Sequence, residues 1–568
     1  MQLELNNRQL VDEIKKNKVN IKTPKTIEDK INWLKIHDST PLKGRCADKL
    51  GLHQYVIEKL GKDICVPVIK VFNDVNDIKF DDLPNEFVIK ANHGYNMNII
   101  CKDKSKLNKE DVIKKCKTWL ATDFGYESCQ PHYSYITPKI FAEKLLGDDK
   151  QVSSLYDYKF WCFNGKPRLW TINDGHGHGD IMYYDMNDRP IDLYGVGVND
   201  KYEKPNGFNT MVEYAEKLSE DFHFVRVDFY CVDGVVYLGE MTFTPGRGYF
   251  RYKKPEDEIM VGNMLKLPTL PKYKEGVSIC LTGYDVADYV EETLDSIKKQ
   301  TWFKTHDNWE ILLGVDYCYN TLKKVQEIMG NYKNLRVFMM DSNRGTYVTT
   351  NTMMSLAKYD KLVRFDCDDI MRPEMIETLV NSMKDTDFIN FKMQNFGKRK
   401  NVQWACGQIM VRHEYFDKYG GYMPWSCSAD SEFEIRLRKI VRRKRLDKVL
   451  FDRRIHTTNL TVAKATNFAS PERRRNLVYC ERVKGWVKSA DDAICVRMTN
   501  TYKEITKDSD ISCYVNAVKP KTEKEKNVGI KKTVSVPYVR KDKAERIKAI
   551  YEARAKKKNI GENNMHNY

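Results

Sequence analysis

The chain has 568 residues, of which 41% are hydrophobic, 11% aromatic and 31% charged, which is typical of globular domains and predicts two to four of them. Fifteen scattered cysteines without a C-x-x-C pair argue against a disulfide or zinc framework. The first residues lack the basic start and apolar core of a signal peptide, and no apolar run approaches the roughly 20 residues of a membrane helix. We therefore expect a soluble, cytoplasmic protein without a transmembrane segment.

The net charge of +16 is concentrated near the C-terminus. Between Lys519 and Ile560 there are 15 Lys and Arg against 5 Asp and Glu. Within this stretch, apolar residues recur at helical spacing over 542–558, which predicts a basic helix. An anionic partner would be attracted to this tail.

Residues 1–25 are predicted to be a loose polar lead, and residues 26–265 a first domain. After a helical beginning, two short strands are expected at 66–72 and 86–91. The second ends in Lys90, followed by a small polar loop, which is one way to cradle a phosphate. An ordinary lysine at a strand edge is the alternative interpretation of this residue taken alone.

Later strands of this domain end in or carry carboxylates. One strand, 139–143, ends in Glu143, and another begins near Asp157. A hairpin over 225–246 places Asp228 and Glu240 on adjacent strands, where both can face one metal ion. The His-Gly-His-Gly repeat at 176–179 is interpreted as a polar loop rather than a metal site.

Taken in this order, these segments resemble the TupA-like ATP-grasp family of polysaccharide and teichuronopeptide biosynthesis over roughly residues 25–265. The resemblance implies an ATP-grasp-like α+β domain that binds ATP and Mg²⁺. It also implies that Lys90 and Lys159 contact the phosphates of ATP and that Glu143 lies near the adenosine. Asp228 and Glu240 would hold the metal ion, and Arg226 would contact the reacting phosphate. Two features depart from the family pattern: Thr242 replaces the usual metal-binding Asn, and the loop after Lys90 has only Gly94 before the bulky Tyr95.

Residues 266–275, with two prolines, are predicted to be a linker, and residues 276–488 a second domain in which strands and helices alternate. Parallel strands joined by crossover helices bring the ends of the strands to one edge of a sheet. We therefore expect Tyr284, Asp316 and the acidic run that begins at Asp366 to meet there.

The acidic run places Asp366, Asp368 and Asp369 directly after an apolar strand. Clustered carboxylates repel one another unless a cation neutralises them, and oxygen ligands at this density suit Mg²⁺ or Mn²⁺ carrying a substrate diphosphate. A solvated acidic turn is the alternative, and the flanking segments decide against it.

This half resembles the GT-A-type inverting glycosyltransferases of family two, which implies a Rossmann-like fold with a mixed sheet, a nucleotide-sugar donor and a divalent metal. The resemblance implies metal ligands at Asp366, Asp368 and His456, and a catalytic base at Asp430. It further implies that donor-binding residues are Thr282, Tyr284, Asp316, Arg344 and Asp369. One departure is Ala429, where the family usually has a second acid.

The predicted architecture is thus a multidomain α/β protein: an ATP-grasp-like domain, a GT-A domain, and a C-terminal extension, 489–568, with a basic helical tail. Two functions stay open. In the first, an inverting glycosyltransferase builds a glycan, and the first domain is a possible ligase. In the second, a phage-type enzyme glycosylates hydroxymethylated bases of DNA, and the first domain is a non-catalytic platform for the acceptor.

Overall fold

The computed structural model describes residues 3–147, 156–173, 182–195, 204–269, 271–396, 401–405, 407–456 and 459–517. The predicted basic tail and the His-Gly-His-Gly repeat at 176–179 lie outside these residues. No helix within the described ranges is long and apolar enough to cross a membrane.

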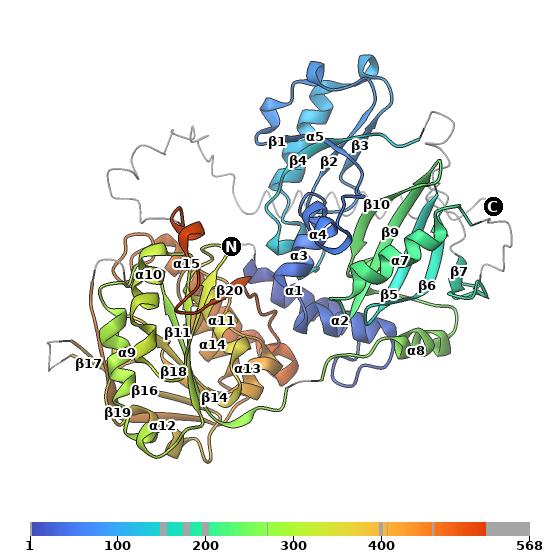
Figure 1. The fold of residues 1–568 in the computed structure, drawn as a ribbon. Coiled ribbons are helices and arrows are strands. Elements are labelled where there is room, and N and C mark those ends of the chain that lie inside the picture. The colour runs from blue at the N-terminus through green and yellow to red at the C-terminus, as the bar shows by residue number, and fades with distance from the viewer. Residues whose placement is uncertain are drawn as a thin grey trace, which may run out of the picture. The chain divides into compact units, whose positions relative to one another are not determined.

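The N-terminal half begins with helices (Figure 1). Residues expected to be a loose lead instead form α1 (Leu3–Lys16). Leu10 and Ile14, four residues apart, bury one face of this helix against Ile36 and Cys129. The polar residues between them hid this short apolar stripe from the sequence analysis. Three further helices follow: α2 (Ile27–His37), α3 (Pro41–Ala47) and α4 (Gly51–Leu60).

Two antiparallel sheets form the rest of this half. The smaller sheet has the strand order β1-β4-β2-β3 and consists of β1 (Val68–Phe72), β4 (Ile140–Glu143), β2 (Phe87–Ala91) and β3 (Asn98–Cys101). The larger sheet has the order β10-β9-β5-β6-β7-β8 and consists of β10 (Val235–Thr242), β9 (Phe224–Val232), β5 (Asp157–Phe163), β6 (Lys166–Asn173), β7 (Met182–Asp185) and β8 (Pro190–Ile191). The helices that accompany them are α5 (Lys109–Ala121), α6 (Phe124–Glu127), α7 (Phe208–Ser219) and α8 (Pro255–Met264).

The C-terminal half is built on one mixed sheet with the order β15-β19-β16-β18-β14-β11-β12-β13-β20, to which β17 adds beside β16. Strands β14, β11, β12 and β13 run parallel, as predicted. The strands are β11 (Lys274–Gly283), β12 (Trp309–Val315), β13 (Leu335–Met340), β14 (Tyr359–Asp366), β15 (Ile370–Met371), β16 (Phe388–Asn395), β17 (Val402–Trp404), β18 (Ile409–Arg412), β19 (Arg443–Arg453) and β20 (Tyr502–Ile505).

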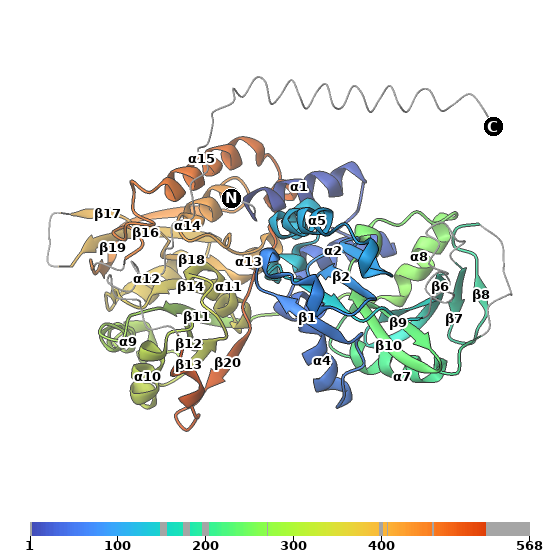
Figure 2. The same ribbon diagram turned by 90° about the horizontal axis from the view of Figure 1, so that it is seen from above.

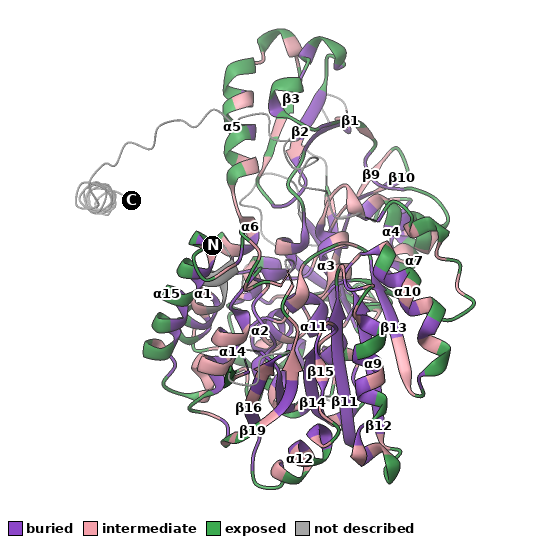
Figure 3. Ribbon diagram, turned by 90° about the vertical axis from the view of Figure 1, so that its left-hand side faces the viewer, coloured by how far each residue is buried: buried purple, intermediate pink, exposed green. Residues whose placement is uncertain are grey.

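Helices cover both faces of this sheet (Figure 2). Alternate residues of β11 point to opposite faces, so Ile279 packs into one core and Cys280 into the other. Figure 3 shows that β11 and β14 are buried along most of their length. One face carries α9 (Val290–Lys298), α10 (Tyr319–Ile328) and α12 (Met375–Ser382), and the other carries α11 (Thr346–Leu356), α13 (His413–Tyr419), α14 (Ala429–Leu437) and α15 (Pro471–Trp486).

The predicted end of the second domain at residue 488 leaves out one strand of this sheet. Strand β20 pairs antiparallel with the edge strand β13, and Ile505 is buried in the core. Only four residues long and half charged, β20 has too little apolar alternation to be recognised from the sequence.

The helix α2 buries a lysine, and this gives a testable effect on stability. Lys35 is 2% exposed, contacts the ring of Tyr249, and has its pKa lowered by burial to about 7. In the unfolded chain the Lys35 amine binds its proton more tightly than in the folded protein. The free energy of unfolding should therefore rise between about pH 7 and pH 10, by about 1–4 kcal/mol. The Lys35→Met variant should lack this rise. Urea unfolding of the wild type and the variant at pH 7 and pH 9.5 measures the change in the free energy of unfolding in each protein. An equal change in the two proteins would contradict the prediction.

Candidate functional site

The acidic run lies where β14 ends at the rim of the sheet. Asp366 is the last residue of β14, and the carboxylate oxygens of Asp366, Asp368 and Asp369 lie within 4.8 Å of one another. Burial, followed by repulsion from neighbouring carboxylates, raises the pKa of Asp369 well above its usual range. A divalent cation would relieve this repulsion, and three hard oxygen donors on one turn fit Mg²⁺ or Mn²⁺.

His456 reaches the same turn from the segment that follows β19. Its Nε2 lies 2.7 Å from Oδ2 of Asp368, and the ring stacks on Tyr289 with the centroids 4.8 Å apart. Asn459 donates to the same Asp368 oxygen at 3.0 Å, while its own Oδ1 accepts from the backbone N–H of His456. The structure therefore brings together two of the predicted metal ligands, and it adds Asn459, which the sequence analysis missed.

The other two carboxylates are held by protein donors. Gln408 donates to Asp366 at 2.7 Å and to Asp369 at 3.1 Å. Asp366 also forms an ion pair with the buried Arg364 at 2.7 Å, and Asp369 accepts from the backbone N–H of Arg454. Both oxygens of Asp366 and both oxygens of Asp369 are thus engaged by protein donors, which fixes the orientation of the turn.

Asp430, the predicted base, lies in the first turn of α14. Its Oδ1 accepts from the Tyr347 hydroxyl at 3.1 Å and from the backbone N–H of Ser431 at 2.9 Å. A Cβ atom at Gly407 would come within 2.5 Å of the Arg364 guanidinium and 2.9 Å of Oδ2 of Asp430. Gly407, whose φ is +97°, therefore allows Asp430, Arg364 and the acidic turn to approach one another.

Glu432, two residues further along α14, has a different role. It is 2% exposed and forms an ion pair with Arg436 at 2.8 Å. Arg436 also donates to the backbone carbonyls of Tyr419 and Gly421. Glu432 is therefore fixed in a buried structural network.

The four predicted donor-binding residues other than Asp369 lie on the strand ends and loops of the same sheet. Asp316 is 2% exposed, and its carboxylate accepts from the backbone N–H groups of Arg344 and Gly345, at 3.1 and 2.9 Å. Thr282 contacts Thr346 through their hydroxyls at 2.9 Å. Asp316 thus positions the loop before α11, while the side chains of Arg344 and Tyr284 are exposed.

Five of the predicted ATP-grasp-like residues form one network on the larger sheet of the N-terminal half. Arg226 donates to Asp228 at 2.7 Å and reaches Glu240 and Thr242 at 3.2 Å each. Lys159, directly opposite Asp228 on β5, pairs with it at 3.1 Å. Burial raises the pKa of Glu240, but nearby cations, Lys49 first, outweigh it and bring the pKa down to about 2.

The remaining two, Lys90 and Glu143, form an ion pair across β2 and β4 of the smaller sheet. Two further charged groups, Lys49 and Asp157, lie in this region, and no role was predicted for either. Lys49, whose pKa burial lowers, interacts with Glu240 as well as with Lys90 and Glu143. Asp157 contacts Lys159, and burial raises its pKa to about 6. A lysine in the turn between α3 and α4 and an aspartate at the start of β5 give no sequence signal of such a site.

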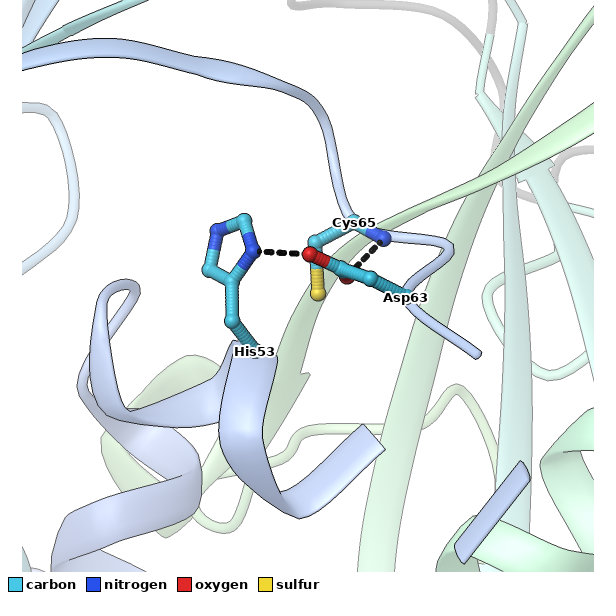
Figure 4. A group of neighbouring side chains, drawn as sticks. All are labelled: His53, Asp63 and Cys65. Atoms are coloured by element: carbon cyan, nitrogen blue, oxygen red, sulfur yellow. Dashed lines mark hydrogen bonds and ion pairs between the residues drawn. The ribbon is translucent and has the colours of Figure 1, made fainter. Parts of the chain in front are cut away.

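A third group of potential metal ligands lies elsewhere in the N-terminal half (Figure 4). His53 on α4 bonds to Asp63 at 2.7 Å, and Asp63 in turn accepts from the backbone N–H of Cys65. Burial raises the pKa of the Cys65 thiol, which opposes the thiolate form that binds metals. The group is explained by its own hydrogen bonds, and we assign it no function.

Comparison with protein families agrees with both halves of the structure. Residues 29–266 match the TupA-like ATPgrasp family, and residues 278–427 match Glycosyl transferase family 2. Both resemblances stated from the sequence are therefore confirmed, as is the predicted fold class of an ATP-grasp-like domain followed by a GT-A domain, within the described residues.

Individual relatives cover smaller parts of the chain. A glycosyltransferase of Haemophilus influenzae is 28% identical over 114 residues, which are 20% of this chain and 34% of the relative. Glycosyltransferase GlyG of Streptococcus pneumoniae is 24% identical over 187 residues, 31% of this chain and 60% of the relative. The crystal structure of S. aureus TarS 1–349 in complex with UDP-GlcNAc has 17% identity and a TM-score of 0.33, and covers 38% of this chain and 68% of that one. The chain thus spans between a third and three fifths of the length of these two curated relatives.

Proposed function

We propose that this chain, whose halves resemble a TupA-like ATP-grasp protein and a family-2 glycosyltransferase, is a metal-dependent inverting glycosyltransferase. It would move a sugar from a nucleotide sugar to an acceptor hydroxyl in glycan synthesis. One observation supports this most strongly: three separate segments meet at the acidic turn. His456 contacts Asp368, Arg364 and Gln408 contact Asp366, and Asp430 lies beside Arg364 at Gly407.

Asp366, Asp368 and His456 would hold the divalent cation. When bound, such a cation supplies a Lewis acid for the negative charge of the leaving nucleoside diphosphate. Oδ2 of Asp368 interacts with His456 and Asn459, so a predicted ligand from the turn and one from the segment after β19 already lie side by side.

Asp430 would accept the proton of the acceptor hydroxyl as the sugar is transferred. A hydroxyl is a weak nucleophile until a positioned base takes its proton. The bonds from Tyr347 and Ser431 fix the orientation of this carboxylate. On the donor side, Asp316 holds the loop that carries the exposed Arg344, which would meet the diphosphate.

A screen of nucleotide release from UDP-, GDP-, ADP- and dTDP-sugars, with glycan acceptors and with hydroxymethylated DNA, tests the proposal. Transfer to a glycan with inversion of the anomeric centre, seen by NMR of the product, is the expected result. Transfer to DNA alone would instead support the phage-type alternative, in which the first domain is an acceptor platform.

The N-terminal half is proposed to bind ATP with Lys90, Lys159 and Arg226 on the phosphates and with Asp228 and Glu240 on Mg²⁺. Each of these cations already pairs with a carboxylate, so ligand binding must exchange those ion pairs for phosphate contacts. Glu143 would lie near the adenosine, and Thr242 would take the place of a metal ligand.

Lys90→Ala and Glu240→Ala should each abolish ATP hydrolysis, by about 100-fold or more, because each removes a charged contact to the phosphates or their metal. Lys115→Ala, which removes an exposed lysine of α5, should retain it. Phosphate release assays check this, with sugar transfer measured on the same samples. If the wild type neither binds nor hydrolyses ATP, the ligase hypothesis fails and the platform hypothesis gains support.

A further inference from the structure

A basic cavity of about 390 Å³ lies between α14 and β19, apart from the residues assigned above. It is lined by Arg438 at the C-terminal end of α14, by Arg443 and Arg445 of β19, and by Glu434. Residues two apart on a strand point to the same face, so Arg443 and Arg445 face α14 together. Three guanidinium groups therefore meet one carboxylate in this cavity.

The charges of this cavity are only partly neutralised. Arg443 pairs with Glu434 and donates to Oδ1 of Asn390 at 2.7 Å, which fixes its position. Arg438 and Arg445 form no ion pair with a carboxylate among the described residues. The Arg445 guanidinium instead lies 4.0 Å from the centroid of the Trp404 ring, and this contact holds it in place. Its N–H donors therefore pair with no carboxylate among the described residues.

The cavity and the proposed base Asp430 lie along the same helix, α14. Asp430, Glu434 and Arg438 are four residues apart in turn, so they follow one less-buried stripe of α14. At about 1.5 Å per residue, Arg438 lies about 12 Å from Asp430 along the helix. An acceptor with its hydroxyl at Asp430 would reach the cavity by spanning this distance.

We propose that this cavity is an acceptor subsite that binds a negatively charged group, a phosphate or a carboxylate, on an anionic glycan. This deepens the proposed function and rests on it. Arginine forks bind both groups through paired hydrogen bonds. A nucleic acid fits less well, because single-stranded binders use open aromatic faces for stacking, whereas the Trp404 ring has Arg445 and Lys392 over it.

The test measures binding to the full chain without donor or metal, so it is independent of sugar transfer. Three fluorescent disaccharides serve as probes: one with a phosphate, one with a glucuronate and one neutral. The wild type should bind a charged probe more tightly than the neutral one, and the probe it prefers identifies the group. The double variant Arg438→Ala/Arg445→Ala should weaken that binding by about tenfold or more.

Lys444→Ala is the matched control, because it removes one positive charge from the opposite face of β19. It should leave the affinity unchanged, and Arg438→Glu serves as a second variant that keeps Arg445 on Trp404. Equal affinity for charged and neutral probes, or unchanged affinity in the double variant, would overturn the proposal. Tighter binding of single-stranded DNA than of either glycan, lost in the double variant, would overturn the assignment to a glycan.

Discussion

Replacing Asp368 with alanine is expected to lower the rate of sugar transfer by at least about 100-fold, because the variant loses a charged ligand at the leaving diphosphate and with it several kcal/mol. Asp368 is the carboxylate that His456 and Asn459 both contact, so its loss also releases those two side chains. Transfer is measured as nucleotide release with saturating donor and Mn²⁺.

The exposed Asp385, which lies after α12, provides the control. Asp385→Ala changes the net charge in the same way and should transfer at the wild-type rate. Transfer by Asp368→Ala within about threefold of the wild type would remove Asp368 from the metal site, since the loss of one metal ligand accounts for a much larger effect.

Replacing Asp430 with asparagine should lower transfer by about 100-fold to 10,000-fold and leave donor affinity unchanged, because an amide of the same shape accepts no proton from the acceptor. The Tyr347 hydroxyl and the Ser431 N–H can still donate to the amide oxygen, so the variant keeps its local structure. Donor binding is measured by calorimetry and transfer by product formation.

A variant of Glu432 distinguishes the loss of a catalytic base from the loss of a buried structural acid. Glu432→Gln breaks the ion pair with Arg436 and should lower the free energy of unfolding, by about 3–5 kcal/mol. Any loss of sugar transfer in Glu432→Gln should follow from this lower stability, because Glu432 is not the proposed base. An Asp430→Asn enzyme with the wild-type rate would show that another group accepts the proton.

The sequence predicted the sheet of the C-terminal half well, because its parallel strands are continuous apolar runs followed by polar residues. The acidic turn was recognisable for the same reason: Asp366 follows Phe365 and ends a buried strand. His456 and Asp430 were assigned only through the order of the family's segments, since a single histidine or aspartate has many ordinary roles.

Other parts of the site gave no usable signal. Arg364 lies in the middle of an apolar strand, and Tyr347 and Asn459 are residue types common in any helix or loop. The importance of Tyr347 and Asn459 arises from contacts across more than 80 residues of chain, from Tyr347 to Asp430 and from Asn459 to Asp368. Contacts of this range are set by the tertiary fold, which local periodicity does not encode.

The hydrogen bonds of Asp316 could not be predicted from the sequence. The resemblance to family-two glycosyltransferases implied that Asp316, at the edge of the sheet, binds the donor. Its carboxylate is used to hold the backbone of the loop at Arg344 and Gly345, with a further bond from Thr349 at 3.0 Å. Asp316 therefore positions this loop, and its role in binding the donor stays a prediction.

The most direct test of the proposed glycosyltransferase is nucleotide release from a panel of nucleotide sugars by the wild type and by Asp368→Ala, each with Mn²⁺ and with excess EDTA. Metal-dependent release from one class of donor by the wild type, and its loss in the variant, is the predicted result. Release that continues at the same rate in EDTA, or that is equal in the two proteins, would contradict a metal-dependent transfer at the acidic turn.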